Sequence, residues 1–243
     1  MNKDICIGVL HHNNPSLILR FLESLYNYTD DFYLVLLDNK STDNSLDVMK
    51  DYLLNKDNAR LIEGGENYGV IGGRNVLFKH FHNNLHNEYL LFLDNDQIVQ
   101  DGWYSQYLEF RDSGDYDIVG VEGWQLRPGS FYPYRKCVSH KEHFNYVGCG
   151  GMMIPRYVVD EVGYFDDQFN PYYFEDPDYA MRASEKGFKL GWNSENRILH
   201  LAHQTIGAKG DKGTQFEKSH RIFMKKWKQY RNNLPTFRNR NLM

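Results

Sequence analysis

The sequence predicts an α/β fold in which helices flank a mixed, mainly parallel central sheet. Two observations predict it. Short apolar runs alternate with segments of helical periodicity over roughly the first hundred residues, which is the pattern of repeated strand–helix–strand units. The runs are nearly continuous, as in strands that are buried on both faces of a parallel sheet. The expected strands of this half are 5–10, 32–37, 59–62 and 88–93.

The segments between these strands have the spacing of amphipathic helices. Pro15 and Ser16 open the first of them, which has apolar side chains three or four positions apart. A second helix is expected over 45–53, and a third follows the glycines at 72 and 73. Because each helix connects two parallel strands, we expect right-handed crossovers.

The second half of the chain has a different pattern, with little helix between its first strands. We therefore expect a mixed or antiparallel extension of the sheet. Pro155 starts an expected helix, and residues 174–186 form another that Gly187 ends. The expected strands of this half are 117–122, 131–138, 146–154, 188–192 and 197–201.

Charge is unevenly distributed along the chain. The formal net charge is −4, yet eight Lys or Arg residues and no Asp or Glu lie between Lys218 and the end. The rest of the chain is acidic, which argues against a general nucleic-acid-binding protein, because such a protein needs a basic surface. The segment 216–231 is expected to form a basic amphipathic helix that lies on an anionic membrane or packs its aromatic side chains against the rest of the chain. Packing is the favoured interpretation.

Cysteine usage and hydropathy favour the cytoplasm. Cys6, Cys137 and Cys149 are odd in number and lack CxxC spacing, as expected in a reducing compartment. The apolar run at 5–10 is too short for a signal peptide, and no stretch of about 18 apolar residues predicts a membrane-spanning helix. We expect a cytoplasmic protein, with peripheral contact at the inner face of the cell membrane as an open alternative.

Polar residues follow the expected parallel strands, at the edge where ligands of such sheets bind. Asp94-Asn95-Asp96 comes directly after a buried strand and places two carboxylates two residues apart. A divalent cation that also binds a pyrophosphate would offset their repulsion, because Mg²⁺ and Mn²⁺ prefer oxygen ligands. The alternative is an Asx-rich turn that caps the next helix. The pair alone leaves both readings open.

A second acidic cluster opens the helix expected at 174–186. Asp176 precedes Pro177, which suits an N-cap followed by proline at the first helical position. A carboxylate at a helix start that is walled by aromatic residues also suits a general base. The alternatives stay open at this point.

Two further segments carry weaker signals. His200 and His203 follow a short strand, and a lone histidine is more often structural than a ligand. The loop from Asn67 to Arg74 is rich in glycine and opens a helix, so its backbone amides suit an anion. It lacks the spacing of a P-loop.

Six segments in this order resemble the family 2 glycosyltransferases of the GT-A fold, over roughly residues 4–205. The segment at 37–45, Leu-Asp-Asn-Lys-Ser-Thr-Asp-Asn-Ser, is similar to the family's vDNgStDgS. The other segments are the Asn13-Asn14 turn, 67–75 (NxGxxxaRN), 93–96 (the DxD position), 148–166 and 175–187 (EDxDlxxRxxxxG).

The resemblance implies roles by position. Residues implied to bind the nucleotide sugar are Asn13, Asp38, Asn67, Arg74, Asp94, Asn95, Gly150 and Gly151. Asp96 and His200, with His203 as the rival, are implied to hold Mn²⁺ or Mg²⁺. Asp176 is implied to be the catalytic base, and Glu175 to contact the acceptor or the sugar.

The resemblance also implies a reaction and a domain organisation. It implies inverting transfer of a sugar from a UDP-, dTDP- or GDP-linked donor to a saccharide or lipid-linked acceptor of a bacterial envelope. Residues 1–205 would form the catalytic domain, with a nucleotide-binding half to about 97 and an acceptor half from about 98 to 205. Residues 206–243 would form a flexible loop, in which 207–213 is a candidate flap, and the basic helix.

Two rival functions remain. A sugar-nucleotidyltransferase would need a glycine-rich turn after the first strand, and 11–15 offers none. A non-catalytic nucleotide-sugar-binding module would be expected to lose Asp176 or the Asp94–Asp96 pair, and all three residues are present.

Overall fold

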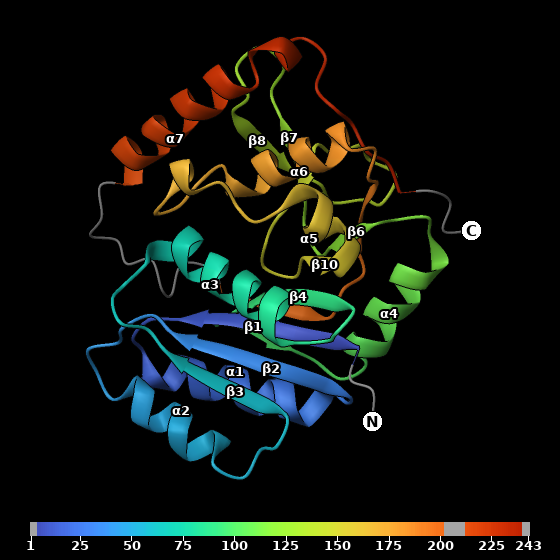
Figure 1. Ribbon diagram of the computed structural model, residues 1–243. Coiled ribbons are helices and arrows are strands. Elements are labelled where there is room, and N and C mark those ends of the chain that lie inside the picture. Colours follow the sequence, from blue (N-terminus) through green and yellow to red (C-terminus); the bar gives the residue numbers. More distant parts are fainter. Residues whose placement is uncertain (1–3, 202–211, 240–243) are drawn as a thin grey trace.

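A three-layer α/β architecture organises the chain (Figure 1). The computed structural model describes residues 4–201 and 212–239. His203 and most of the 207–213 segment lie outside the described residues. The prediction of an α/β fold with a mixed, mainly parallel central sheet is confirmed.

The central sheet has seven strands, and its order places the end of β4 near the middle. In spatial order the strands are β11 (Leu190–Trp192), β6 (Ile118–Gly120), β10 (Met153–Pro155), β4 (Tyr89–Asp94), β1 (Ile5–His11), β2 (Phe32–Asp38) and β3 (Ala59–Glu63). Only β10 runs antiparallel to its neighbours β4 and β6. The sheet therefore extends in the mixed manner that the second half of the sequence predicts.

Helices cover both faces of this sheet, and each face has its own apolar core. One face of the sheet packs on α1, α2 and α4. In Figure 1 α1 and α2 lie below the sheet, and α3 lies above it. The helices are α1 (Pro15–Tyr28), α2 (Ser45–Leu53), α3 (Gly69–Asn84), α4 (Trp103–Ser113), α5 (Arg156–Val162), α6 (Glu175–Glu185) and α7 (Lys212–Lys226). Two short 3₁₀ helices, η1 (Asp167–Phe169) and η2 (Lys228–Tyr230), complete the helical elements.

Two small antiparallel sheets sit beside the end of β4. One pairs β5 (Gln97–Val99) with β12 (Ile198–His200), which brings His200 opposite Gln97. The other has the order β8 (Pro133–Lys136), β7 (Gly123–Leu126) and β9 (Tyr146–Val147). These pairings carry residues from the second half of the chain to the edge where the parallel strands end.

The sequence predicts the first four strands to within one residue at each end. It is less accurate further on, where the strands β5 and β7 were not expected. The helix α4 was not expected, although its buried residues Trp103, Tyr107 and Phe110 have helical spacing. The strand expected at 146–154 is two short strands, because a turn that includes Gly151 at φ +95° separates them. That turn lines the candidate site described below.

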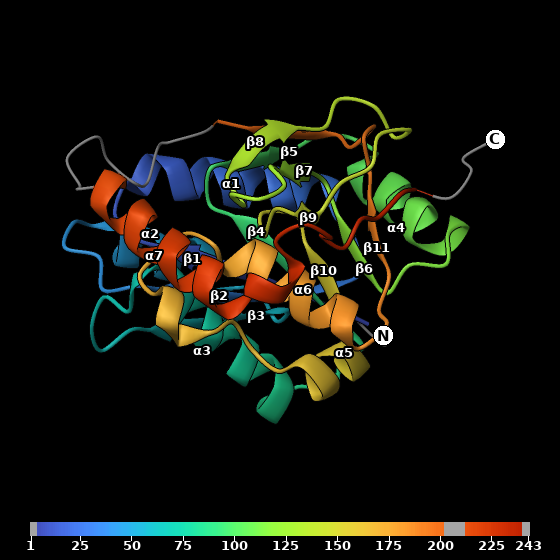
Figure 2. The same cartoon turned by 90° about the horizontal axis from the view of Figure 1, so that it is seen from above.

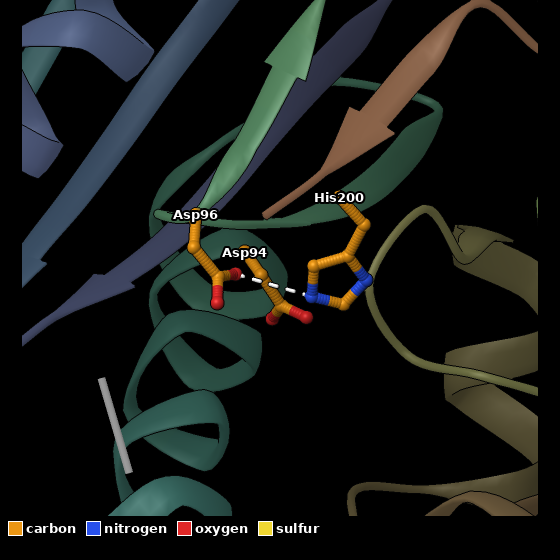
Figure 3. A group of neighbouring side chains, drawn as sticks. All are labelled: Asp94, Asp96 and His200. Atoms are coloured by element: carbon orange, nitrogen blue, oxygen red, sulfur yellow. Dashed lines mark ion pairs between the residues drawn. The ribbon is translucent and has the colours of Figure 1, made fainter. Parts of the chain in front are cut away.

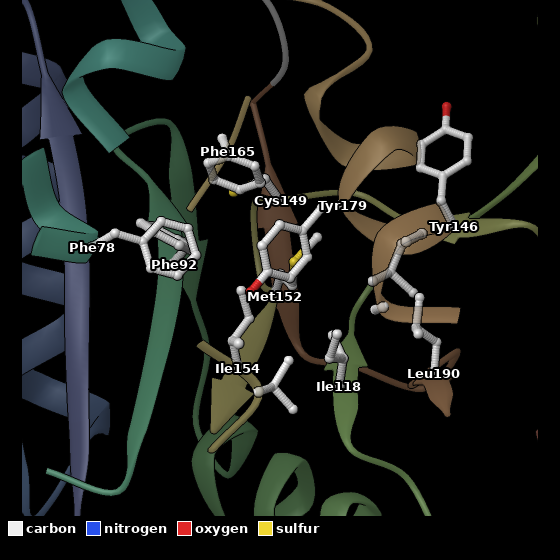
Figure 4. Close-up of a cluster of buried hydrophobic side chains, with 14 of the residues drawn as sticks. Phe78, Phe92, Ile118, Tyr146, Cys149, Met152, Ile154, Phe165, Tyr179 and Leu190 are labelled. Atoms are coloured by element: carbon white, nitrogen blue, oxygen red, sulfur yellow. The ribbon is translucent and has the colours of Figure 1, made fainter. Parts of the chain in front are cut away.

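A cluster of aromatic side chains joins the two halves of the chain (Figure 4). Phe78 of α3 has its ring 4.9 Å from that of Phe92 on β4 and 5.1 Å from that of Phe165. Tyr179 of α6 packs on the same group, 5.3 Å from Phe165. Contacts of this kind add about 0.5–1.5 kcal/mol per pair to area burial. The cluster therefore fixes α3, β4 and α6 relative to one another.

The basic helix packs on the same domain through its aromatic face. Phe223 and Trp227 are buried, and the Trp227 indole N–H donates to Asp178 at 2.9 Å. Lys226 lies between Asp166 and Asp178, at 2.6 and 2.7 Å. In Figure 2 α7 runs across the side of the molecule that holds α6.

The expectation that the aromatic side chains of this segment pack against the rest of the chain thus agrees with the structure. The exposed basic side chains of α7 lie on the opposite face of the helix. No helix within 4–201 or 212–239 is long and apolar enough to cross a bilayer. Membrane contact through 216–231 and the domain division at 205 stay predictions.

Candidate active site

A cavity of about 270 Å³ lies beyond the carboxyl end of β4. Its walls come from α3, from the turn after β9, from the start of α6 and from β12. The acidic and basic side chains that line it are Arg74, Asp94, Glu122, Glu175, Asp176 and His200. Both acidic clusters and the histidine of the sequence analysis therefore meet at one cavity.

The guanidinium of Arg74 connects the two acidic clusters. It lies on α3 and donates to Asp94 at 2.7 Å and to Glu175 at 3.1 Å. Only 8% of Arg74 is exposed. A buried charge without partners is costly, so the two carboxylates and the guanidinium require one another. The contact fixes the start of α6 against the end of β4.

Asp94, Asp96 and His200 form a cluster of ligand-type atoms (Figure 3). One ligand atom from each residue lies within 4.8 Å of the other two. The Nε2 atom of His200 is 3.2 Å from Asp96 Oδ1. Hydrogen bonds to Asp96 and then to Glu122 raise the pKa of His200 to about 10. The carboxylates thus attract positive charge to this point.

This donor set fits a hard divalent cation. Two carboxylates and one imidazole suit Mn²⁺, and oxygen ligands suit Mg²⁺. Ligand atoms lie about 2.0–2.1 Å from Mg²⁺, so two of them can be at most about 4.2 Å apart. The three ligand atoms therefore need to move only slightly closer together to bind one ion.

Glu122 is a site residue that the sequence analysis missed. It follows β6, lies 3.5 Å from Nδ1 of His200 and accepts a hydrogen bond from Lys136 at 2.6 Å. Burial alone would raise its pKa, but the hydrogen bonds from His200 and Lys136 outweigh burial and lower the pKa to about 2. It belongs to none of the recognised motifs. The one feature of the sequence that could have indicated this residue is that an ionisable side chain stands at the end of an expected apolar strand.

The start of α6 presents Glu175 and Asp176 to the cavity. The N-cap is Phe174, at φ 71°, so the expectation that Asp176 caps the helix is wrong. Tyr173 before it is also left-handed, at φ 80°. Such strained positions persist where surrounding packing imposes them, and they often occur at functional sites. Both acidic side chains line the cavity.

Asp176 has an unusual environment for a carboxylate. Its Oδ1 atom is buried and has no hydrogen-bond partner within the described part of the chain. Burial, with the neighbouring charge of Glu175, raises the pKa of Asp176 well above its usual range. A carboxylate with a raised pKa is a stronger base than an exposed one.

Gly150 allows Asp94 to enter the cavity. A Cβ atom on Gly150 would lie 2.3 Å from Asp94 Oδ2. Gln97 joins the same two residues, because its amide donates to the Gly150 carbonyl and its oxygen accepts from the Asp94 amide. Gly151 has a positive φ, and its Cβ would meet Val121 at 2.3 Å. The turn after β9 can therefore shape the cavity only with glycine at both positions.

The remaining predicted nucleotide-binding residues lie at the ends of β1, β2 and β4. Asp38 accepts from the Ser41 amide, and Asn13 accepts from the Thr42 amide. Asn95 lies beside His11, with 2.7 Å between their side-chain nitrogens. These contacts hold the strand ends and loops in place, and nucleotide binding by these residues stays a prediction.

Asn67 and the start of α3 form a separate part of this edge. Asn67 accepts from the Gly69 amide at 2.9 Å. The next amides, of Val70 and Ile71, both donate to the Pro171 carbonyl. The expectation that these helix N-terminal amides bind an anion is therefore wrong, because another segment of the chain occupies them.

Comparison with known proteins assigns the family. Residues 6–147 match the family model described as glycosyl transferase family 2. This chain belongs to that family. A poly(ribitol-phosphate) beta-glucosyltransferase from Bacillus spizizenii is 32% identical over 119 residues, which are 47% of this chain and 18% of the relative. The match thus spans less than a fifth of that relative's length.

Solved structures of glycosyltransferases share the fold. GalNAc-T7 with UDP, GalNAc and Mn²⁺ aligns with a TM-score of 0.72, at 14% identity, over 92% of this chain and 48% of that one. Residues 1–349 of S. aureus TarS with UDP-GlcNAc align at 0.60 and 19% identity, over 80% and 57%. The mannosyltransferase PcManGT from Pyrobaculum calidifontis, with GDP-Man and Mn²⁺, aligns at 0.61 and 16% identity, over 79% and 55%.

The contact between Gly150 and Asp94 yields a direct test of the site. We expect Gly150→Ala to displace the Asp94 carboxylate and to weaken Mn²⁺ binding by at least tenfold in calorimetric titration. Because Asp94 also pairs with Arg74, the thermal transition should fall, and it verifies that the variant is still folded. Gly148→Ala in the same turn is the matched control, because the nearest atom to its new Cβ is 3.6 Å away. Equal affinity of the two variants would contradict this account of Gly150.

Proposed function

We propose that this chain is a metal-dependent, inverting glycosyltransferase that moves a sugar from a nucleoside diphosphate to an acceptor hydroxyl. One observation carries the proposal. The Asp94–Asp96–His200 cluster faces the same cavity as the Asp176 oxygen that has no hydrogen-bond partner among the described residues. Arg74 connects Asp94 to Glu175, the neighbour of Asp176. A cation site for a diphosphate and a base for a hydroxyl are the two devices that this reaction requires.

Asp94, Asp96 and His200 would hold Mn²⁺ or Mg²⁺. When bound, the cation supplies positive charge that stabilises the departing diphosphate. GalNAc-T7 and PcManGT were both solved with Mn²⁺ and a nucleotide or nucleotide sugar, which supports this ion and this donor class. The nucleoside would lie toward the ends of β1 and β2, where Asn13, Asp38 and Asn67 line the edge.

Asp176 would accept the proton of the attacking hydroxyl. Inversion requires the acceptor to approach the anomeric carbon from the side opposite the diphosphate, so the base and the cation must lie across the cavity from each other. Arg74 keeps Glu175 in place beside Asp176, where Glu175 can accept a hydrogen bond from a sugar hydroxyl. General-base assistance of this kind contributes about 10²–10⁴-fold to the rate.

The acceptor would enter through a smaller cavity of about 120 Å³ that borders Asp176 from the other side. Pro133 of β8 and Phe216 of α7 form its outer walls. Its inner walls, Tyr146, Tyr173, Glu175 and Asp176, also line the larger cavity. Aromatic walls and two carboxylates favour a neutral sugar or polyol at this position over a phosphate group.

Removal of the cation tests the proposal as a whole. We expect release of nucleoside diphosphate from a panel of UDP-, dTDP- and GDP-sugars to require Mn²⁺ or Mg²⁺, to stop with a chelator and to return when excess metal is added. The measurement is nucleotide release, with a mixture of saccharide acceptors and with water alone. Turnover that persists undiminished in the chelator would exclude the metal-dependent mechanism.

Asp176→Asn separates catalysis from binding. We expect the transfer rate to fall by about 10²–10⁴-fold, since the amide cannot take the proton. Donor affinity in the presence of Mn²⁺, measured by calorimetry, should stay within a few-fold of wild type. Asp160→Asn on α5 is the control, because this exposed aspartate pairs with His82 and does not line the cavity. Unchanged turnover in Asp176→Asn would rule out this residue as the base.

The pH dependence offers a second test of Asp176. The base must be ionised, so kcat/KM is lost as pH falls through its pKa. Because burial and Glu175 raise that pKa, the acid limb should lie above the value of about 3.9 for an ordinary aspartate. Glu175→Gln removes the neighbouring negative charge and should move the limb to lower pH.

The control for this shift is Glu185→Gln, at the other end of α6, where Glu185 accepts a hydrogen bond from Tyr230. Its profile should match wild type. An acid limb that stays in place or moves to higher pH in Glu175→Gln would contradict the assignment.

A further inference from the structure

We propose that Glu122 is a positioning residue of the metal site, which holds the imidazole of His200 so that Nε2 points at Asp96 and toward the cation. The inference deepens the proposed function and rests on the Asp94–Asp96–His200 cation site. No recognised motif contains Glu122.

The two nitrogens of His200 have different partners. Nε2 lies 3.2 Å from Asp96 Oδ1, and Nδ1 lies 3.5 Å from Glu122 Oε1. A neutral imidazole carries one N–H and one lone pair. With the N–H on Nδ1 directed at Glu122, the lone pair on Nε2 faces Asp96 and Asp94. Ligating histidines commonly donate their second N–H to a carboxylate, which fixes the ring and its tautomer.

Glu122 is itself held on several sides. Its Oε1 atom accepts from Lys136 at 2.6 Å, and its Oε2 atom accepts from the Trp124 indole at 3.3 Å. Its backbone carbonyl accepts from the Gly148 amide at 3.0 Å. Its side chain is only 17% exposed. A carboxylate with this many partners has one preferred position and can fix the ring beside it.

Lys136 gives Glu122 a permanent counter-charge. A histidine that ligates a cation is neutral, so it no longer pairs electrostatically with Glu122. Without a second cation nearby, a largely buried carboxylate would then be left uncompensated. Lys136 on β8 prevents this, because its ammonium contacts the same oxygen that faces His200.

The space around His200 shows why an orienting group is needed. A second cavity, of about 370 Å³, borders His200 but not Asp176, and Gln97, Lys136, Trp192 and Ile198 are among its walls. His200 and Glu122 line both this cavity and the candidate active site. The ring thus has room to turn away from Asp96, and Glu122 is the side chain that holds Nδ1 in place.

Metal titration of single variants tests this role without any need for the acceptor. We expect Glu122→Ala to weaken Mn²⁺ binding about 10–100-fold by calorimetry. The side chain in Glu122→Gln keeps an oxygen that can accept a hydrogen bond from the Nδ1–H group of His200. This variant should therefore retain most of the wild-type affinity for Mn²⁺. Glu161→Ala is the matched control, because Glu161 also pairs with a lysine, Lys186, at an exposed site on α5. Thermal unfolding of each variant verifies that it is folded.

NMR spectroscopy distinguishes a change in the orientation of the His200 ring from a general loss of metal binding. In ¹⁵N NMR with Mg²⁺, a diamagnetic ion, wild type and Glu122→Gln should show His200 protonated at Nδ1. Glu122→Ala should show a mixture of the two tautomers.

The outcomes distinguish the two proposals. If wild type binds neither ion and Asp96→Asn changes nothing, the cation site itself is wrong. If wild type binds Mn²⁺, Asp96→Asn abolishes binding and Glu122→Ala binds as wild type does, the site stands and the role of Glu122 is overturned. Glu122→Gln that loses as much affinity as Asp96→Asn also overturns it, because Glu122 would then be a direct ligand.

Discussion

The buried guanidinium of Arg74 is the constraint on which the candidate site depends. It bridges Asp94 and Glu175, which lie 20 and 101 positions from it in the sequence. The guanidinium is itself buried, and the removal of one partner of a buried pair typically costs about 3–5 kcal/mol. The bridge therefore couples the end of β4, the second turn of α3 and the start of α6, and it places the proposed base at a fixed position relative to the proposed cation.

Apolar packing supplies the stability that such a charge network does not. Buried ion pairs rarely add net stability, because desolvation offsets their attraction. The aromatic cluster of Phe78, Phe92, Phe165 and Tyr179 joins the same three elements as Arg74 (Figure 4). Burial of one large apolar side chain contributes roughly 1.5–3 kcal/mol. The cluster holds the elements together, while the guanidinium fixes the orientation of the carboxylates at their ends. Helix α7 extends this support, because Phe223 and Trp227 pack against the start of α6.

The sequence predicts those parts of the site that depend on patterns of residues close together in the chain. Continuous apolar runs identify the parallel strands, and polar residues at strand ends then identify the edge that holds Asp94 and Asp96. Glu122 could not be found in this way, because its proximity to His200 depends on the strand order β11-β6-β10-β4, which the chain order does not determine. The amides of Val70 and Ile71 were misjudged for a similar reason, since Pro171 reaches them from a distant segment. Local spacing likewise gives no sign that Phe174 rather than Asp176 caps α6.

The charges around the cavity explain why a donor with a diphosphate would need a cation. Five carboxylates lie in or beside it: Asp94, Asp96, Glu122, Glu175 and Asp176. Arg74 and Lys136 are the permanent positive charges paired with them, and His200 adds a third when it is protonated. A diphosphate brings further negative charge into a site that is already acidic, and like charges at close range in a poorly solvated cavity repel strongly. A divalent ion at Asp94, Asp96 and His200 would replace a single proton with two positive charges at the point where the diphosphate must bind. On this argument the acidic surroundings select for a metal-bound donor and disfavour the free nucleotide sugar.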